Sequence, residues 1–266
     1  MGVVNVTPDS FSRDGCLSRT GGPKYALSLA QKYIRDGADI IDIGGESSRP
    51  GALRITAKEE INRVIPTIQA LVKKTTVPIS IDTYKPLVAK AALDAGASIV
   101  NNIMGTNNPN DNLLKMIKKY DAAVVLMHMR GTPQTMQRNI HYHDLINEII
   151  SAFGKSIEKC LEIGIKSDKI ILDPGIGFGK TVEHNLEILN RLDDFGALER
   201  PLLIGTSRKS FIGKVLNREV GNRLMGTAAT VTTSITRGAH IVRVHDVKAM
   251  KEIALMTDAI LNAPNN

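Results

Sequence analysis

Short apolar runs recur along the chain, separated by stretches of helical periodicity, and nearly every run ends on a polar residue. Continuous apolar runs are typical of parallel strands that are buried on both faces. In a (β/α)8 barrel the active site lies at the C-terminal ends of such strands. The pattern therefore predicts a site built from many strand ends, which are Asn5, Asp42, Asp82, Asn101, His128, Asp173, Lys209, and Arg243 with His245.

Eight segments between or after these runs have the spacing of amphipathic helices. Eight runs and eight helices make a complete α/β fold of the TIM (β/α)8 barrel type. Because periodicity does not show how a parallel sheet closes, an open doubly wound sheet is the alternative. The predicted helices cover residues 25–36, 57–73, 86–95, 113–120, 144–164, 183–193, 223–237 and 247–261.

The length of 266 residues fits one barrel of about 250 residues, so residues 1–266 are expected to form a single domain. No run approaches the roughly 18 apolar residues of a membrane span, and the first residues lack the pattern of a signal peptide. Two cysteines, Cys16 and Cys160, have no CxxC partner and favour free thiols. We expect a soluble, cytoplasmic protein without a membrane partner.

The formal net charge of +7 is compatible with binding to nucleic acid or to a small anionic substrate. The basic residues are scattered, however, and aromatic residues make up only 4% of the chain with no Trp, so platforms for base stacking are scarce. The composition therefore favours small-molecule substrates and no nucleic-acid partner.

Asp82, Asn101 and Asp173 close three apolar runs, which predicts that their side chains point into the mouth of the barrel. A carboxylate accepts two parallel N–H bonds, and an amide both donates and accepts, so this cluster suits a flat heterocycle with several N–H donors. A general acid–base pair and a metal cage are the alternatives. A cage of carboxylates is less suitable, since hard cations need about six oxygens.

Arg243 and His245 are two residues apart in the last run, so both side chains are expected on one face of the strand. Together with Lys209 from the segment GTSRKSF, they form a predicted anion pocket for phosphate or diphosphate. The alternative is that Arg243 and His245 only pair with Asp246 or Asp42.

The loops after the first two runs, VTPDSFSRDGCLSRTGGP and GGESSRPGALRI, are long and rich in Pro, Gly and hydroxyl residues. Long loops at the active face of a barrel usually cover the substrate. Asp9, Phe11 and Arg49 favour this interpretation over ordered surface turns, because an exposed ring with two opposite charges is unusual in a plain turn.

The segment DPGIGFGKT resembles a nucleotide-binding loop but lacks the required glycines, since Pro174 and Lys180 occupy two of their positions. We interpret it as a turn that lets a flat ligand approach the backbone near Asp173 and Phe178.

Seven segments, taken in order, resemble one enzyme family over essentially the whole chain. They are NVTPDSFS, GGESSRPG, ISIDTYK, MHMRGTPQTMQ, DPGIGFGK, GTSRKSF and RVHDV. Each is a weak signal alone, but together they are specific to the dihydropteroate synthases. Members of that family are barrels that join 7,8-dihydropterin-6-ylmethyl diphosphate to 4-aminobenzoate in folate biosynthesis and release diphosphate. Sulfonamides compete for their aminobenzoate site.

The resemblance implies a role for each matching position. The implied pterin-binding residues are Asp42, Asp82, Asn101, Met127, Asp173, Phe178, Gly205 and Lys209. The implied 4-aminobenzoate residues are Thr7, Pro8, Phe11, Ser48, Pro50 and Ser210. The diphosphate is implied at Asn5, Arg49, Arg243 and His245, and its Mg²⁺ cofactor at Asn5. The implied catalytic residues are Asp9, Arg49, Lys209, Arg243 and His245.

The implied chemistry is early cleavage of the exocyclic C–O bond, which gives a cation-like methylene near Asp9 and needs no protein nucleophile. The resemblance also implies a homodimer, with the helical segment ATVTTSITRGA as a candidate contact. The first loop departs from the family pattern, since Arg13 is inserted and Cys16 replaces a glycine. This departure keeps a non-catalytic pterin-binding barrel as an alternative function. A pterin-binding methyltransferase is the other alternative, because that class uses a similar barrel with similar Asp and Asn residues at its strand ends.

Overall fold

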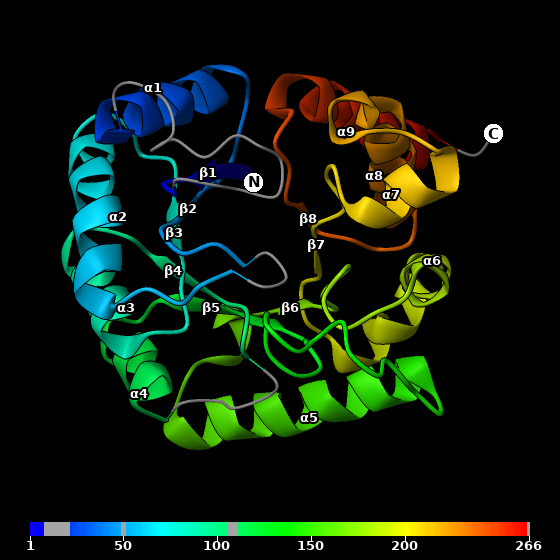
Figure 1. The fold of residues 1–266 in the computed structure, drawn as a ribbon, viewed down its shortest axis with the longest axis horizontal. Coiled ribbons are helices and arrows are strands. Elements are labelled where there is room, and N and C mark those ends of the chain that lie inside the picture. The colour runs from blue at the N-terminus through cyan, green and yellow to red at the C-terminus, as the bar shows by residue number, and fades with distance from the viewer. Residues whose placement is uncertain (8–21, 49–51, 106–110, 265–266) are drawn as a thin grey trace.

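Eight short strands surround the centre of the molecule and run parallel to their neighbours (Figure 1). The computed structural model describes residues 1–7, 22–48, 52–105 and 111–264. The strands are β1 (Gly2–Asn5), β2 (Ile41–Gly44), β3 (Ile79–Asp82), β4 (Ile99–Asn102), β5 (Ala123–Met127), β6 (Ile170–Asp173), β7 (Leu203–Ile204) and β8 (Ile241–Val242).

The strands follow one another around the barrel in sequence order. β1 to β6 form one sheet in that order, and β7 pairs with β8. Parallel bridges between Leu172 and Leu202 and between Gly2 and Val244 join the two sheets on both sides. The ring is thereby closed, which confirms the predicted (β/α)8 barrel and excludes an open doubly wound sheet.

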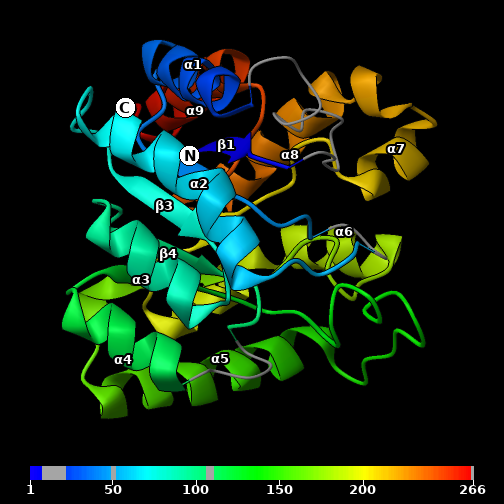
Figure 2. The same ribbon diagram turned by 60° about the vertical axis from the view of Figure 1, so that its left-hand side comes forward.

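The helices lie outside the strands (Figures 1 and 2). Neighbours from α1 to α5 pack against one another in order, and α8 packs against α9. The helices are α1 (Gly22–Arg35), α2 (Ala57–Val72), α3 (Pro86–Asp94), α4 (Asp111–Lys119), α5 (Leu145–Ile163), α6 (Val182–Asn190), α7 (Ser210–Leu216), α8 (Leu224–Thr236) and α9 (Val247–Leu261). Short 3-10 helices cover Ser167–Lys169, Leu192–Leu198 and Val220–Asn222.

Several helix ends are fixed by local chemistry. The side chain of Thr56 accepts a hydrogen bond from the N–H of Glu59 at the start of α2, and Asp144 does the same for Asn147 in α5. Gly164 ends α5 with a φ of 93°, a left-handed conformation that glycine adopts at little cost.

The described residues contain nine α-helices where eight were predicted, because α7 lies between β7 and α8. Its seven residues span about two turns, too few for periodicity to reveal. The prediction that the seventh strand continues to Lys209 was also wrong. β7 ends at Ile204, and the chain then turns through Arg208, whose φ is +59°.

The inside of the barrel changes from apolar to polar along several strands. Ile99, Val125, Ile171 and Leu203 form a buried apolar cluster with Met1. Since side chains two residues apart share a face of a strand, the next inward positions belong to Asn101, Met127, Asp173 and Gly205. The same spacing relates Ile40 to Asp42 and Ile241 to Arg243. The apolar layer thus forms the floor on which the polar strand ends stand.

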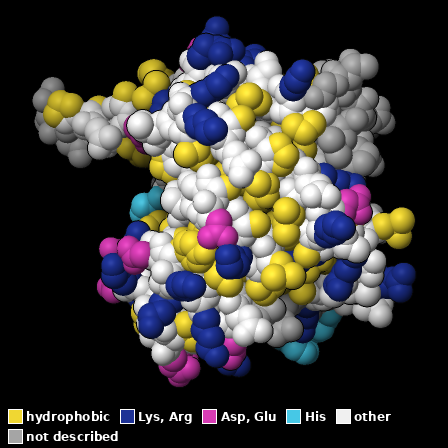
Figure 3. Space-filling view, turned by 90° about the vertical axis from the view of Figure 1, so that its left-hand side faces the viewer, with side chains coloured by type: hydrophobic (Ala, Val, Ile, Leu, Met, Phe, Trp, Pro, Cys, Tyr) yellow, Lys and Arg dark blue, Asp and Glu magenta, His cyan; other side chains and the backbone are white. Residues whose placement is uncertain are grey.

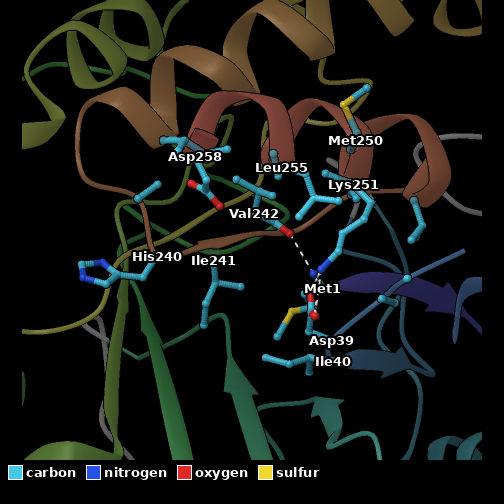
Figure 4. Close-up of a pocket in the computed structure, with 17 residues that line it drawn as sticks. Met1, Asp39, Ile40, His240, Ile241, Val242, Met250, Lys251, Leu255 and Asp258 are labelled. Carbon is cyan, nitrogen blue, oxygen red and sulfur yellow. Dashed lines mark hydrogen bonds and ion pairs between the residues drawn. The ribbon is translucent and has the colours of Figure 1, made fainter. Parts of the chain in front are cut away.

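The opposite end of the barrel holds a separate, mainly apolar cavity of about 280 Å³ between the strand starts and α9 (Figure 4). Lys251 of α9 reaches Asp39, with Nζ 2.9 and 3.0 Å from the two carboxylate oxygens. The amino group of Met1 donates to the carbonyl of Val242 at 2.9 Å. These contacts attach α9 and β8 to the starts of β1 and β2.

The face that carries α2 and α3 mixes Lys and Arg with acidic side chains, and hydrophobic side chains gather near its middle (Figure 3). Val72 and Leu87 are exposed on these two helices. Within the described ranges, no helix has both the length and the apolar character needed to cross a membrane.

Candidate active site

A polar pocket opens at the C-terminal ends of the strands. Twelve of the predicted site residues line it: Asn5, Thr7, Ser48, Asp82, Asn101, Met127, Asp173, Phe178, Gly205, Lys209, Arg243 and His245. They come from β1 and β3 to β6 and from the segments that follow β1, β2, β6, β7 and β8. The structure therefore brings together residues that are up to 240 positions apart, counting from Asn5 to His245.

Arg243 joins the charged groups at the bottom of the pocket. Its Nε lies 2.7 Å from Oδ2 of Asp42, and its Nη2 lies 2.9 Å from Oδ2 of Asp82. Asn101 donates from Nδ2 to the same oxygen of Asp42 at 3.2 Å. Asp42 is fully buried, so its carboxylate orients both Arg243 and Asn101 from beneath.

The ion pair with Asp42 was the alternative interpretation of Arg243, and it is present. It does not remove Arg243 from the pocket, which the side chain still lines. Asp246, the other suggested partner, is instead held by Arg208, whose Nε and Nη2 donate to it at 2.9 and 2.5 Å. His245 contacts Ser207, with Nδ1 3.1 Å from Oγ.

Asn101 offers an acceptor to a ligand. Its side chain is 3% exposed, and its Oδ1 has no hydrogen-bond partner within the described residues. Buried polar atoms nearly always find a partner, so an N–H group of a bound molecule is the natural one. With Asp82 and Asp173 beside it, the pocket presents three acceptor side chains to a single ligand.

The turn after β6 forms one wall of the pocket. The N–H of Gly175 donates to Oδ1 of Asp173 at 2.7 Å, which fixes the carboxylate. Nζ of Lys209 lies 4.1 Å from the centre of the Phe178 ring, a cation–π contact. The wall therefore combines an acceptor, a flat apolar surface and a cation.

The charges in the pocket shift one another's protonation. Burial raises the pKa of Asp82 to about 7, while Arg243 lowers it and Asp42 raises it. Burial also raises the pKa of Asp173. Burial and the neighbouring Arg243 lower the pKa of Lys209 to about 8. Such shifts near neutral pH are typical of functional sites.

Two predicted site residues lie outside the pocket lining. Asp42 lies beneath the pocket, where it contacts Arg243 and Asn101 as a supporting acid would. Ser210 is exposed at the first position of α7. Five further residues lie outside the described part of the chain: Pro8, Asp9, Phe11, Arg49 and Pro50.

Sequence reasoning also missed residues that line the pocket. They are Glu46, Ile103, Ile176, Ser207 and Arg208, whereas Ser47, which also lines the pocket, lies in the second loop that was expected to cover the substrate. Ser207 and Arg208 lie in the segment GTSRKSF, where adjacency to Lys209 was a usable signal. Ile103 and Ile176 follow strand ends as apolar residues, and nothing in their type marks them as pocket residues.

Comparison with known proteins identifies the family. The family model described as pterin binding enzyme matches residues 1–245. The dihydropteroate synthase of Synechocystis sp. is 46% identical over 98% of this chain and 89% of its own. The chain belongs to the dihydropteroate synthase family. The predicted family, and with it the transferase class, is confirmed.

Solved structures of dihydropteroate synthases have the same fold. That of Yersinia pestis, crystallised with a sulfonamide drug complex, has a TM-score of 0.93 and 41% identity over 99% of this chain and 94% of its own. That of Clostridium difficile, crystallised in the presence of pteroic acid, has a TM-score of 0.89 and 45% identity over 99% of this chain and 96% of its own. These likenesses cover nearly all of this chain and at least 94% of either solved chain.

Proposed function

We propose that this pocket binds the ring of 7,8-dihydropterin-6-ylmethyl diphosphate and that the chain transfers its methylene to the amine of 4-aminobenzoate. The acceptors of Asp82, Asn101 and Asp173 match the N–H-rich edge of a pterin. The single observation that carries the proposal is this set of acceptors, with Oδ1 of Asn101 left without a described partner, in one pocket lining with the cations Lys209 and Arg243.

The reaction follows from the position of the cations. The exocyclic C–O bond breaks, the diphosphate leaves with the bonding electron pair, and the aminobenzoate nitrogen forms the new C–N bond and loses a proton. Lys209, Arg243 and His245 stabilise the charge on the departing diphosphate. Asp82 and Asp173 hold the ring, so that the positive charge on the methylene can spread into it.

The residues that are present suit a Mg²⁺ ion bound mainly through the substrate. Among the described residues, no group of three or more His, Cys, Asp or Glu side chains could hold a metal. Mg²⁺ commonly keeps water and phosphate ligands and takes only one or two oxygens from the protein. Asn5, which lines the pocket at the end of β1, would supply such an oxygen. When bound, the ion would neutralise charge on the diphosphate.

The 4-aminobenzoate site is proposed in the part of the same pocket that Thr7 and Ser48 line. The roles of Asp9, Phe11, Arg49, Pro50 and Ser210 in this site, and of Pro8, stay predictions from the resemblance. Binding of sulfonamides at this position is part of the proposal, as is the cytoplasmic location.

Diphosphate release tests the proposed reaction. The purified protein is incubated with the dihydropterin diphosphate, Mg²⁺ and 4-aminobenzoate, and each component is omitted in turn. We expect release that needs all three and is inhibited competitively by a sulfonamide. Tight pterin binding without release would indicate the non-catalytic barrel, and methyl transfer from a methylated folate would indicate the methyltransferase.

The pH profile tests the roles of Asp82 and Lys209. Asp82 accepts two parallel N–H bonds only when ionised, so kcat/KM for the pterin substrate should fall about tenfold per pH unit below about 7. Lys209 stabilises the diphosphate only when protonated, so kcat/KM should fall again above about 8. The Lys209→Arg variant should lose this alkaline limb, because arginine stays charged. An unchanged alkaline limb in that variant would rule out Lys209 as its source.

We also infer a homodimer. α7 and α8 carry four exposed large apolar side chains, Val215, Leu216, Leu224 and Met225, and Met225 is 79% exposed. Light scattering after gel filtration should give about twice the 28.9 kDa of one chain. Met225→Lys should shift the mass toward the monomer, whereas Leu87→Lys on α3 should not. A monomeric wild-type protein at micromolar concentration would contradict the inference.

A further inference from the structure

Lys180 is a buried lysine that the reaction does not use. Burial lowers its pKa to about 7, while the neighbouring Asp173 favours the charged ammonium. Its side chain is 3% exposed and lies under the turn that follows β6. Nζ is 3.0 Å from the carbonyl oxygen of Phe178, 3.3 Å from that of His128 and 3.1 Å from Nδ1 of His128. A protonated lysine has three N–H donors, and three acceptors surround this one.

His128 completes the arrangement at the end of β5. Burial and the charge of Lys180 lower the pKa of His128 to about 2, so its ring is neutral. A neutral imidazole has one acceptor nitrogen, and contact with the ammonium makes Nδ1 that acceptor. The His128 N–H donates to the carbonyl of Asp173 at 2.8 Å, which ties the ends of β5 and β6 together.

The turn is pressed closely against His128. A Cβ atom on Gly175 would lie 2.0 Å from the His128 carbonyl oxygen, so no side chain fits between them. Lys180 bonds to this same oxygen and to the carbonyl of Phe178. The ammonium therefore connects the turn after β6 to the end of β5, at a position where water has little access.

The position of the turn determines the wall of the pocket. Phe178 presents its ring to Lys209, and Asp173 lies at the start of the turn with its carboxylate bonded to the Gly175 N–H. A shift of the Phe178 carbonyl would move the Phe178 ring and disturb the contact of that ring with Lys209. The positive charge of Lys180 also stabilises the ionised form of Asp173.

We propose that Lys180 is a positioning residue for the pterin: its ammonium joins the carbonyls of His128 and Phe178 and thereby sets the place of Asp173 and the Phe178 ring. This inference rests on the proposed function, because it takes the ligand of that wall to be a pterin. It predicts that loss of the ammonium raises the Kd for the pterin far more than it raises the KM for the aminobenzoate substrate.

The test compares Lys180→Met with the wild-type protein. The variant keeps an unbranched side chain of similar length but has no N–H donor and no charge. Binding of 6-hydroxymethylpterin is measured by calorimetry, and the aminobenzoate KM is measured at saturating pterin substrate. We expect the pterin Kd to rise about 10- to 100-fold, with the aminobenzoate KM changing less than about 3-fold.

Leu113→Ala is the control for a general loss of stability. Leu113 is fully buried in α4, which contributes no residue to the pocket. The Leu113→Ala substitution should lower the Tm without raising the pterin Kd at a temperature where the variant is folded. If Lys180→Met does not fold, Lys180→Gln replaces it, since the shorter neutral amide cannot reach all three acceptors.

The possible outcomes separate the two proposals. A wild-type protein that does not bind the pterin overturns the proposed function itself. Pterin binding by the wild type that is unchanged in the Lys180 variant overturns the positioning role. Equal losses for both substrates, matched by Leu113→Ala, also overturn it, because they would reduce Lys180 to a general contribution to stability.

Discussion

Replacing Arg243 with methionine is expected to lower kcat/KM about 1,000-fold or more, because the variant loses a cation at the departing diphosphate. The loss has a second cause. Arg243 lowers the pKa of Asp82, so without it Asp82 would be protonated at neutral pH and would accept fewer N–H bonds. The variant should also be less stable by about 3–5 kcal/mol, since Asp42 stays buried without its ion pair.

A double variant separates the two effects. Asp42→Asn combined with Arg243→Met removes the uncompensated charge, so urea denaturation should show that part of the lost stability returns. Diphosphate release should stay low, because the cation is still missing. If Arg243→Met alone keeps more than about a tenth of wild-type kcat/KM, the role of Arg243 in leaving-group stabilisation is wrong.

The strand pattern predicted both the barrel and the floor of the site for one physical reason. A buried parallel strand is apolar until it leaves the core, and inward side chains repeat every second residue. Ile99 therefore leads to Asn101 and Ile171 to Asp173. A polar residue at the end of such a strand can be read directly from the chain.

The choice between partners at distant strand ends could not be made in the same way. Asp42 and Asp246 were both candidate partners for Arg243, and the structure pairs Arg243 with Asp42, 201 positions earlier, and Asp246 with Arg208. Such partners depend on side-chain reach within a closed barrel, which periodicity does not describe. α7 was missed for a related reason. The helix follows a turn at Arg208 that has a left-handed backbone conformation, and an arginine in the sequence does not indicate such a conformation.

The segment DPGIGFGKT shows where composition and geometry must be combined. Its glycines predicted a close approach of the backbone, and the structure has φ values of +71°, +82° and +64° at Gly175, Gly177 and Gly179. The group that the backbone approaches at Gly175 is the carbonyl of His128 in the same chain. The role of Lys180 became visible only with its acceptors in place.

Gly175→Ala is accordingly expected to damage both the fold and the site. The new Cβ would lie 2.0 Å from a backbone oxygen, and the residue has a φ of +71° that alanine adopts only under strain. Strain and overpacking together should lower the free energy of unfolding by about 2–4 kcal/mol. Because the backbone oxygen cannot rotate away, the turn must move, and a displacement of about 1 Å can cost 100-fold in activity.

Gly154→Ala is the matched control, since it makes the same chemical change at a helical position of α5 where a Cβ meets nothing within 4 Å. It should raise the free energy of unfolding by up to about 1 kcal/mol and leave pterin binding unchanged. Urea denaturation and calorimetry of both variants provide the comparison. If Gly175→Ala matches the wild type in stability and pterin Kd, the turn can move away from His128 without cost. The position of the Phe178 ring would then not depend on the close contact between Gly175 and the His128 carbonyl.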